Sequence, residues 1–84
     1  MKLNIKALAL AAGLLWGSAM LMVALGNLVS PDYGVAFLSL VASVYPGYTP
    51  STGVGSVVIG TVYGFVDGAI GGLIFGWLYN ALAK

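Results

Sequence analysis

Long apolar stretches near the two ends of the chain, with a shorter one between them, are the main pattern of the sequence. Residues 7–29 contain no charged side chain, and Ser18 and Asn27 are their most polar members. A helix needs about 20 apolar residues to cross the hydrocarbon core of a membrane. We therefore predict a first transmembrane helix over residues 7–29.

The last apolar stretch, residues 50–82, is interrupted by a single charged side chain, that of Asp67. Thr49 followed by Pro50 is a typical pair for an N-cap and a first helical position. A helix over residues 50–82 would be about 50 Å long, so it would have to tilt or project from the bilayer. We predict the second transmembrane helix over this range.

The middle stretch, residues 31–45, is apolar but short. Ser30 followed by Pro31 is again a helix-start signal, and a Pro-Gly pair follows Tyr45 and ends the helix. A helix over residues 31–45 would be about 22 Å long, which is short for a hydrocarbon core of about 30 Å. We predict an interfacial or re-entrant helix over residues 31–45, and a third span if the bilayer thins locally.

This pattern predicts an all-α integral membrane protein that forms one unit over residues 1–84: a two-helix transmembrane hairpin with a short interfacial or re-entrant helix between the spans. Hydrophobic residues make up 61% of the chain and charged residues only 6%. A soluble domain has about 25% charged residues. The lipid bilayer is therefore the first partner that the composition indicates.

The positive charges predict the orientation of the hairpin. Lys2, Lys6 and Lys84 lie near the two termini, and residues 30–52 between the spans contain no Lys or Arg. Loops with Lys and Arg stay on the cytoplasmic side of a membrane. We therefore predict that both termini are cytoplasmic.

The residue types that are absent exclude several classes of function. The chain has no Cys and no His, so it has no disulfide, no reactive thiol and no metal site built from these residues. Asp67 has no base or nucleophile as a partner in the apolar stretches, so we predict a protein that is not an enzyme and has no cofactor. The sequence also lacks a basic run that could bind nucleic acid.

Glycine recurs at every fourth position in the second predicted span. The members of this glycine ladder are Gly60, Gly64, Gly68, Gly72 and Gly76, and Ser56 continues it by one step. A glycine inside a helix costs about 1 kcal/mol relative to alanine, and close packing of membrane helices can offset this cost. The first span has a shorter row with Gly13 and Gly17. We predict that helices pack through these positions.

The ladder also predicts contact with a further chain. Four residues turn a helix by about 40° more than a full circle, so the ladder winds around the helix. Ser56 and Gly60 then share a side with Asp67, whereas Gly72 and Gly76 lie on another side. A lone hairpin supplies only one neighbour. We therefore predict a homo-oligomer or an assembly with larger membrane subunits.

Asp67 is the residue whose chemistry is most unusual for its position. A carboxylate at the centre of a span costs about 2.5–3.5 kcal/mol on insertion scales. It is either an ion or proton site or a hydrogen-bonded group that holds helices together. An antiparallel register brings it near Ser18 and Trp16, and Tyr63 lies one turn away on its own helix. We predict that these four residues form a buried polar cluster.

Four short motifs are shared with a known group of proteins. They are MKLN at residues 1–4, YPGY at residues 45–48, YGFVDG at residues 63–68 and WLYN at residues 77–80. The chain resembles, over most of its length, small bacterial membrane proteins that are labelled bacteriophage holins. Holins are pore formers of the inner membrane, and many have two spans with both ends inside. The resemblance implies a bacterial inner-membrane location and a holin-like function.

Two functions follow as expectations. The first is a small oligomeric membrane protein, holin-like or channel-like, that assembles through the glycine ladder. The alternative is a structural accessory subunit that docks onto a larger membrane protein complex, with Asp67 neutral and hydrogen-bonded. A pore needs a polar stripe along a helix, but Ile74 and Leu78 continue the face of Asp67 with apolar side chains. This pattern favours assembly over constitutive conduction.

Overall fold

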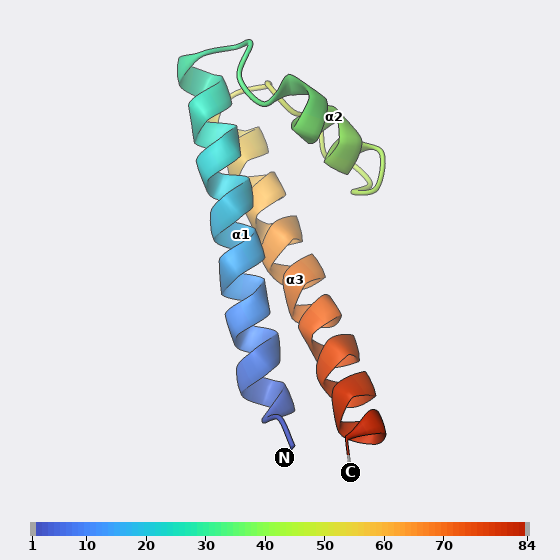
Figure 1. Cartoon of the computed structure of the whole chain (residues 1–84). Helices are drawn as coiled ribbons and strands as arrows, with labels where there is room; N and C mark the ends of the chain where they lie inside the picture. The colour runs from blue at the N-terminus through green and yellow to red at the C-terminus, as the bar shows by residue number, and fades with distance from the viewer. Residues whose placement is uncertain (1, 84) are drawn as a thin grey trace.

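The computed structural model describes residues 2–83 and has three helices (Figure 1): α1 over Ile5–Val29, α2 over Val35–Ala42 and α3 over Val54–Leu82. No strand occurs among the described residues. α1 and α3 lie side by side in opposite directions, so the two ends of the chain lie together (Figure 1). The predicted all-helical fold with two long helices is confirmed.

The surfaces of α1 and α3 are mostly apolar and mostly exposed. Both helices are long and apolar enough to cross a membrane. Only 28% of the most apolar stretch of α1 and 22% of that of α3 are buried within the chain. The core helix of a soluble protein would be largely buried, whereas a helix that is apolar all round needs apolar surroundings. This exposure agrees with the predicted membrane insertion.

The start of α1 is set by a capping residue. The Asn4 side chain accepts a hydrogen bond from the Ala7 backbone N–H at 3.0 Å, which satisfies one free N–H group of the first turn. The helix therefore begins at Ile5, slightly before the predicted residue 7, and it ends at Val29.

α3 begins at Val54, later than the predicted residue 50. Ser51 and Gly53 have φ angles of 67° and 103°, and a right-handed helix cannot continue through such angles. The Thr49-Pro50 signal therefore lies in a turn, and the helix starts only after the chain has left it.

α2 is an eight-residue helix and is shorter than the predicted range 31–45. The predicted start at Ser30 is a turn instead, because the Tyr33 backbone N–H donates to the Ser30 carbonyl oxygen at 2.8 Å. Gly34 follows with a φ angle of 69°, which glycine adopts without strain, and the chain changes direction there. The helix then begins at Val35.

Asn27 is a buried polar residue near the end of α1, and it holds both ends of the connection. Its amide nitrogen donates to the carbonyl oxygens of Pro31 at 3.0 Å and Tyr33 at 2.9 Å. Its side-chain oxygen accepts a hydrogen bond from the Ser51 hydroxyl at 2.7 Å. One side chain thus ties the segments before α2 and before α3 to α1.

The core of the molecule lies where α2 and the turn after it meet the two long helices. α2 folds back beside the pair instead of continuing the line of α1 (Figure 1). The buried residues of this core cluster are Met20, Leu38, Val41, Tyr45 and Tyr48. Because Tyr45 and Tyr48 belong to the turn after α2, the cluster fixes that turn against α1 and α3.

Candidate functional site

Most of the glycine ladder faces α1. The members in contact with this helix are Gly64, Gly68, Gly72 and Gly76. A Cβ atom added to Gly68 would lie 2.5 Å from the Ala12 carbonyl oxygen, and one added to Gly72 would lie 2.8 Å from the Ala9 Cα atom. Neither distance leaves space for a side chain. The backbones of α1 and α3 are therefore in direct contact at these positions.

The glycines of α1 form the opposite side of the same contact. A Cβ atom on Gly13 would lie 2.8 Å from the Phe65 carbonyl oxygen, and one on Gly17 would lie 3.2 Å from the Phe65 Cβ atom. Gly17 also meets Gly64, where an added Cβ atom would lie 3.2 Å from the Gly17 Cα atom. The small residues of the two helices therefore face each other.

The outer members of the ladder have different neighbours. A Cβ atom on Gly60 would lie 2.9 Å from the ring of Tyr48, so this glycine makes room for the turn after α2. Ser56 is buried, and its hydroxyl donates to the Gly53 carbonyl oxygen at 2.7 Å in the first turn of α3. Gly60 therefore adjoins the turn after α2, and the Ser56 hydroxyl bonds at the start of its own helix.

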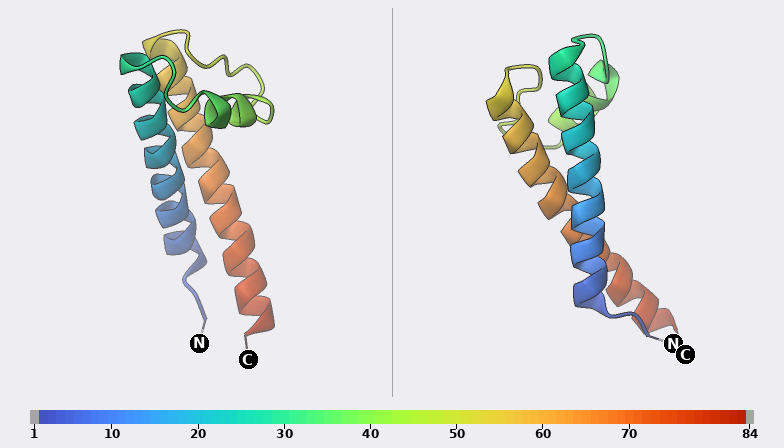
Figure 2. Two further views of the ribbon diagram at one scale, coloured as in Figure 1. Left: turned by 45° about the horizontal axis from the view of Figure 1, so that its top comes forward. Right: turned by 90° about the vertical axis from the view of Figure 1, so that its left-hand side faces the viewer.

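The expectation that the winding ladder needs a second neighbour is corrected for its inner part, because Gly72 and Gly76 lie against α1, as Gly64 and Gly68 do. α1 and α3 cross each other (Figure 2), and a crossing helix can follow a ridge of every fourth residue as it winds. One neighbour therefore covers the whole inner part of the ladder. Gly71 is not a member of the ladder and lies open beside Asp67, because an added Cβ atom there would meet no described residue within 4 Å.

Asp67, near the middle of α3, is joined to α1 through the turn after α2. The Trp16 indole N–H donates to the Tyr45 hydroxyl oxygen at 2.9 Å. The Tyr45 hydroxyl in turn donates to the Asp67 Oδ2 atom at 2.8 Å. The three residues form one hydrogen-bonded chain, the Trp16–Tyr45–Asp67 chain, which links all parts of the fold.

Tyr63 supports this chain without binding the carboxylate. Its ring stacks on that of Tyr45, with 4.9 Å between the ring centroids and 8° between the planes. Its hydroxyl donates to the Pro46 carbonyl oxygen in the same turn. Tyr63 therefore positions Tyr45, which is the direct partner of Asp67.

The predicted buried cluster is corrected in two members. Ser18 and Asp67 are exposed, whereas Trp16 and Tyr63 are partly buried. Two residues turn a helix by about 200°, so Ser18 and Trp16 cannot both face the same neighbour. Trp16 points to the side of Asp67, and Ser18 lies on the other side of α1.

Sequence reasoning missed Tyr45 for two reasons. A tyrosine next to a Pro-Gly turn suits a membrane surface, and nothing local shows that the turn folds back onto α3. The register of the helices also differs from the expected one. The Leu3 backbone N–H donates to the Asn80 Oδ1 atom at 2.7 Å, and this register places Trp16 closer than Ser18 to the level of Asp67.

The protonation of Tyr45 suits its place between a donor and an acceptor. Burial raises the pKa of the Tyr45 hydroxyl; the hydrogen bond from Trp16 lowers it, and the nearby Asp67 raises it further. The net shift is upward, so the hydroxyl keeps its proton at neutral pH. It can therefore accept from the indole and donate to the carboxylate at the same time.

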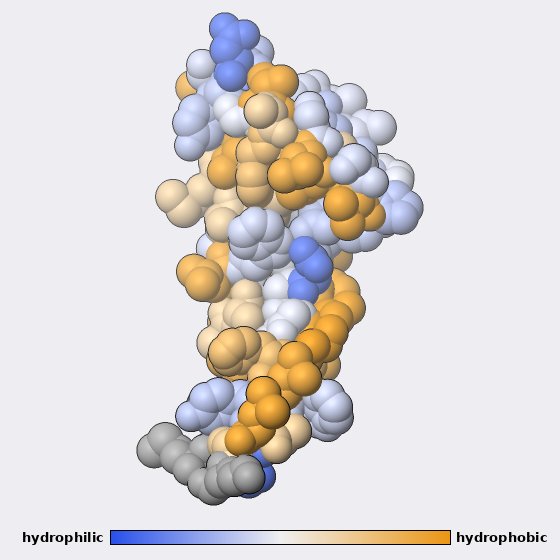
Figure 3. Space-filling model, turned by 45° about the vertical axis from the view of Figure 1, so that its right-hand side comes forward, coloured by the Kyte–Doolittle hydropathy of each residue, from blue (hydrophilic) through white to orange (hydrophobic). Residues whose placement is uncertain are grey.

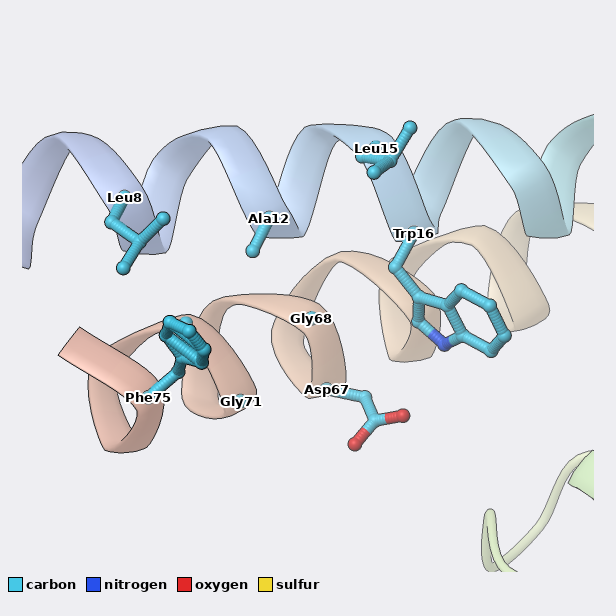
Figure 4. A pocket seen from close by; sticks show the side chains of 9 residues that line it. Leu8, Ala12, Leu15, Trp16, Asp67, Gly68, Gly71 and Phe75 are labelled. Atoms are coloured by element: carbon cyan, nitrogen blue, oxygen red, sulfur yellow. The ribbon is translucent and has the colours of Figure 1, made fainter. Parts of the chain in front are cut away.

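A groove of about 540 Å³ lies beside the Asp67 carboxylate (Figure 4). Its walls include Leu8, Ala12 and Trp16 of α1 and Asp67, Gly71 and Phe75 of α3. The space-filling view has a small, strongly hydrophilic patch at mid-height, next to surface of intermediate hydropathy, with hydrophobic side chains below it (Figure 3). The groove is thus apolar, with one carboxylate in its wall. We call it the Asp67 groove.

The contacts of the described residues at this site are hydrogen bonds. The described residues contain no group of three His, Cys, Asp or Glu side chains that could hold a metal ion. The fold and the site define an all-helical protein with two helices able to cross a membrane and a carboxylate at the middle of one. No known protein family, curated protein or solved structure matches the chain.

Proposed function

We propose that this chain is a small membrane protein that acts by assembling with another transmembrane chain through the Asp67 groove. The observation that carries this proposal is the exposure of Asp67 near the middle of α3. A carboxylate at the centre of a span costs about 2.5–3.5 kcal/mol on insertion scales. A partner that covers the groove and donates a hydrogen bond to Asp67 would offset this cost.

The proposed setting is the inner membrane of a bacterium, with both termini in the cytoplasm. The fold supports the part of this proposal that places both termini on one side of a bilayer. α1 and α3 are both able to span a bilayer, and the ends of the chain lie together. The Lys2 ammonium group donates to the Asn80 carbonyl oxygen at 2.9 Å, so a positive charge stays at that end. α2 would then lie on the outer side, as a re-entrant or interfacial helix.

Assembly is better supported than conduction. Ile70, Ile74 and Leu78 are exposed apolar residues on the part of α3 between Asp67 and the termini. A continuous polar path therefore does not run along this helix past Asp67. The ladder glycines Gly68 and Gly72 are used within the hairpin, so the proposed assembly uses the Asp67 groove in place of the ladder.

A holin-like or channel-like oligomer is the second candidate. The observation that favours it is that the Trp16–Tyr45–Asp67 chain opens to the outside of the hairpin and is not sealed within it. A ring of hairpins with their carboxylates turned inward would place a ring of acidic groups in a pore, as cation channels do. The accessory-subunit function needs only one covered carboxylate per hairpin.

Native mass spectrometry after gentle detergent extraction tests the proposal. We expect the wild type to leave the membrane in a complex, either of several copies or with other subunits. Asp67→Ala should raise the share of the chain that is monomeric, because the groove then loses its polar contact. The control is Asp32→Ala, which removes the other acidic residue, in the connection. A wild type that is monomeric at every concentration would overturn the proposal.

Ion flux into liposomes distinguishes the two candidates. If the chain conducts, purified wild type should pass protons or cations and Asp67→Asn should reduce the flux. If the chain is an accessory subunit, neither protein should raise the flux above that of empty liposomes.

A further inference from the structure

Two polar groups near the middle of the hairpin have unused hydrogen-bonding capacity. Tyr45 binds only the Oδ2 atom of Asp67, and the Oδ1 atom accepts no hydrogen bond from the described residues. The Ser18 hydroxyl is exposed and, within residues 2–83, makes no hydrogen bond. A hydroxyl donates and a carboxylate accepts, so these two groups complement each other chemically.

The two groups lie on opposite sides of the α1–α3 pair. Asp67 borders the groove formed with Ala12 and Trp16. Ser18 borders a second, smaller groove of about 110 Å³, whose walls include Thr61 and Phe65 of α3. The two grooves share no residue. The hairpin therefore carries an acceptor on one side and a donor on the other.

Both groups lie at nearly the same depth along the hairpin. Gly17 contacts Phe65, and the helices are antiparallel, so Ser18 lies level with about Gly64 of α3. This level is three residues, or about 4.5 Å along the helix, from Asp67 and further from the chain ends. Side chains on a helix lean toward its N-terminus. α1 and α3 run in opposite directions, so Ser18 leans toward the chain ends and Asp67 leans away from them. The two side chains therefore approach a common level.

We infer that the partner at the Asp67 groove is a second copy of this chain in the same orientation, whose Ser18 hydroxyl donates to the free oxygen of Asp67. This inference rests on the proposed function and names the partner. One contact satisfies both groups in every pair of neighbours. Because the two sides differ, the contact is head-to-tail and can repeat into a closed ring.

Two other arrangements fit the groups less well. A symmetric dimer through the Asp67 groove would bring two carboxylates together, and like charges repel each other. A basic partner residue cannot come from this chain at this depth, because Lys2, Lys6 and Lys84 lie near the termini. A foreign helix with a buried cation could bind Asp67, but it would leave Ser18 unsatisfied.

Association of the full chain in liposomes tests the inference. Energy transfer between two labelled populations reports the affinity, and native mass spectrometry reports the composition. We expect Ser18→Ala and Asp67→Ala each to weaken self-association by about three- to tenfold, the range that hydrogen bonds between membrane helices give. The double variant should be no weaker than one single variant, because both remove the same contact.

Two controls keep the result specific. Ser18→Thr keeps the hydroxyl and should associate like the wild type. Ser39→Ala removes an exposed serine of α2 and should have no effect. Self-association that depends on Asp67 but not on Ser18 would overturn the inference and leave the proposed function intact, and so would capture of an unrelated subunit alone. A chain that remains monomeric would overturn both.

Discussion

The side of α3 that faces α1 differs from the side that carries Asp67 in what surrounds its small residues. On the inner side, Gly68 and Gly72 lie against the backbone of α1 and leave no space for a side chain. On the outer side, Gly71 adjoins Asp67 and borders an open groove. Glycine thus allows close helix packing on the inner side and borders an unfilled groove on the outer side. The spacing of the glycines alone does not show which of them hold α1 and α3 together.

A large substitution on each side should separate these roles most clearly. Gly68→Leu places a side chain where the Ala12 carbonyl oxygen is 2.5 Å from the first added atom. The helices must then move apart, and we expect a loss of about 3 kcal/mol or more in the free energy of unfolding. Denaturation in detergent mixtures, followed by circular dichroism, measures this loss.

Gly71→Leu is the matched control. Gly71 lies about one turn of α3 from Gly68, but an added side chain there would point into open space. The hairpin should keep its stability or gain up to about 1 kcal/mol, since leucine favours a helix more than glycine does. Equal losses in both variants would show that the difference between the two sides of α3 does not hold.

The sequence was sufficient for the features that depend on local pattern. Apolar runs predicted both long helices, and the four-residue spacing singled out Gly64, Gly68 and Gly72, all of which contact α1. These features follow from the period of a single helix. The apolar surroundings of Asp67 likewise marked it as unusual without any knowledge of the fold.

The features that sequence reasoning missed depend on how separate segments meet. The crossing of α1 and α3 decides that one neighbour covers Gly76 as well as Gly64, and no local pattern sets that crossing. The return of Tyr45 to Asp67 depends on the turn after α2 and on the hydrogen bonds that Asn27 makes in the connection. Both features depend on contacts between segments that are far apart in the sequence, so local pattern could not predict them.

The Tyr45 hydroxyl connects Trp16 of α1 with Asp67 on the outer side of α3. Its removal therefore tests how much this connection stabilises the hairpin. Tyr45→Phe removes the group between Trp16 and Asp67 and leaves the indole N–H without its acceptor. We expect a loss of about 1–2 kcal/mol in stability, as for other partly buried groups that lose a partner. The fluorescence of Trp16 should also shift, and a Trp77→Phe background isolates that signal.

Tyr63→Phe is the control for Tyr45, because it keeps a stacked ring and removes only a hydrogen bond to the Pro46 carbonyl oxygen. Its effect on stability should be smaller, and the emission of Trp16 should not change. If the two variants behaved alike, the hydrogen bonds of Tyr45 to Trp16 and Asp67 would contribute no more to stability than the single hydrogen bond of Tyr63.

Ser18→Ala should have the smallest effect on the hairpin itself. The Ser18 side chain is exposed and makes no hydrogen bond within residues 2–83, so its removal should change the free energy of unfolding by less than about 0.5 kcal/mol. The measurement is the same denaturation of dilute, monomeric chain. A larger loss would show that Ser18 supports the fold. A small loss combined with weakened self-association would assign this hydroxyl to the contact between copies, because only an interaction outside the hairpin could explain both results.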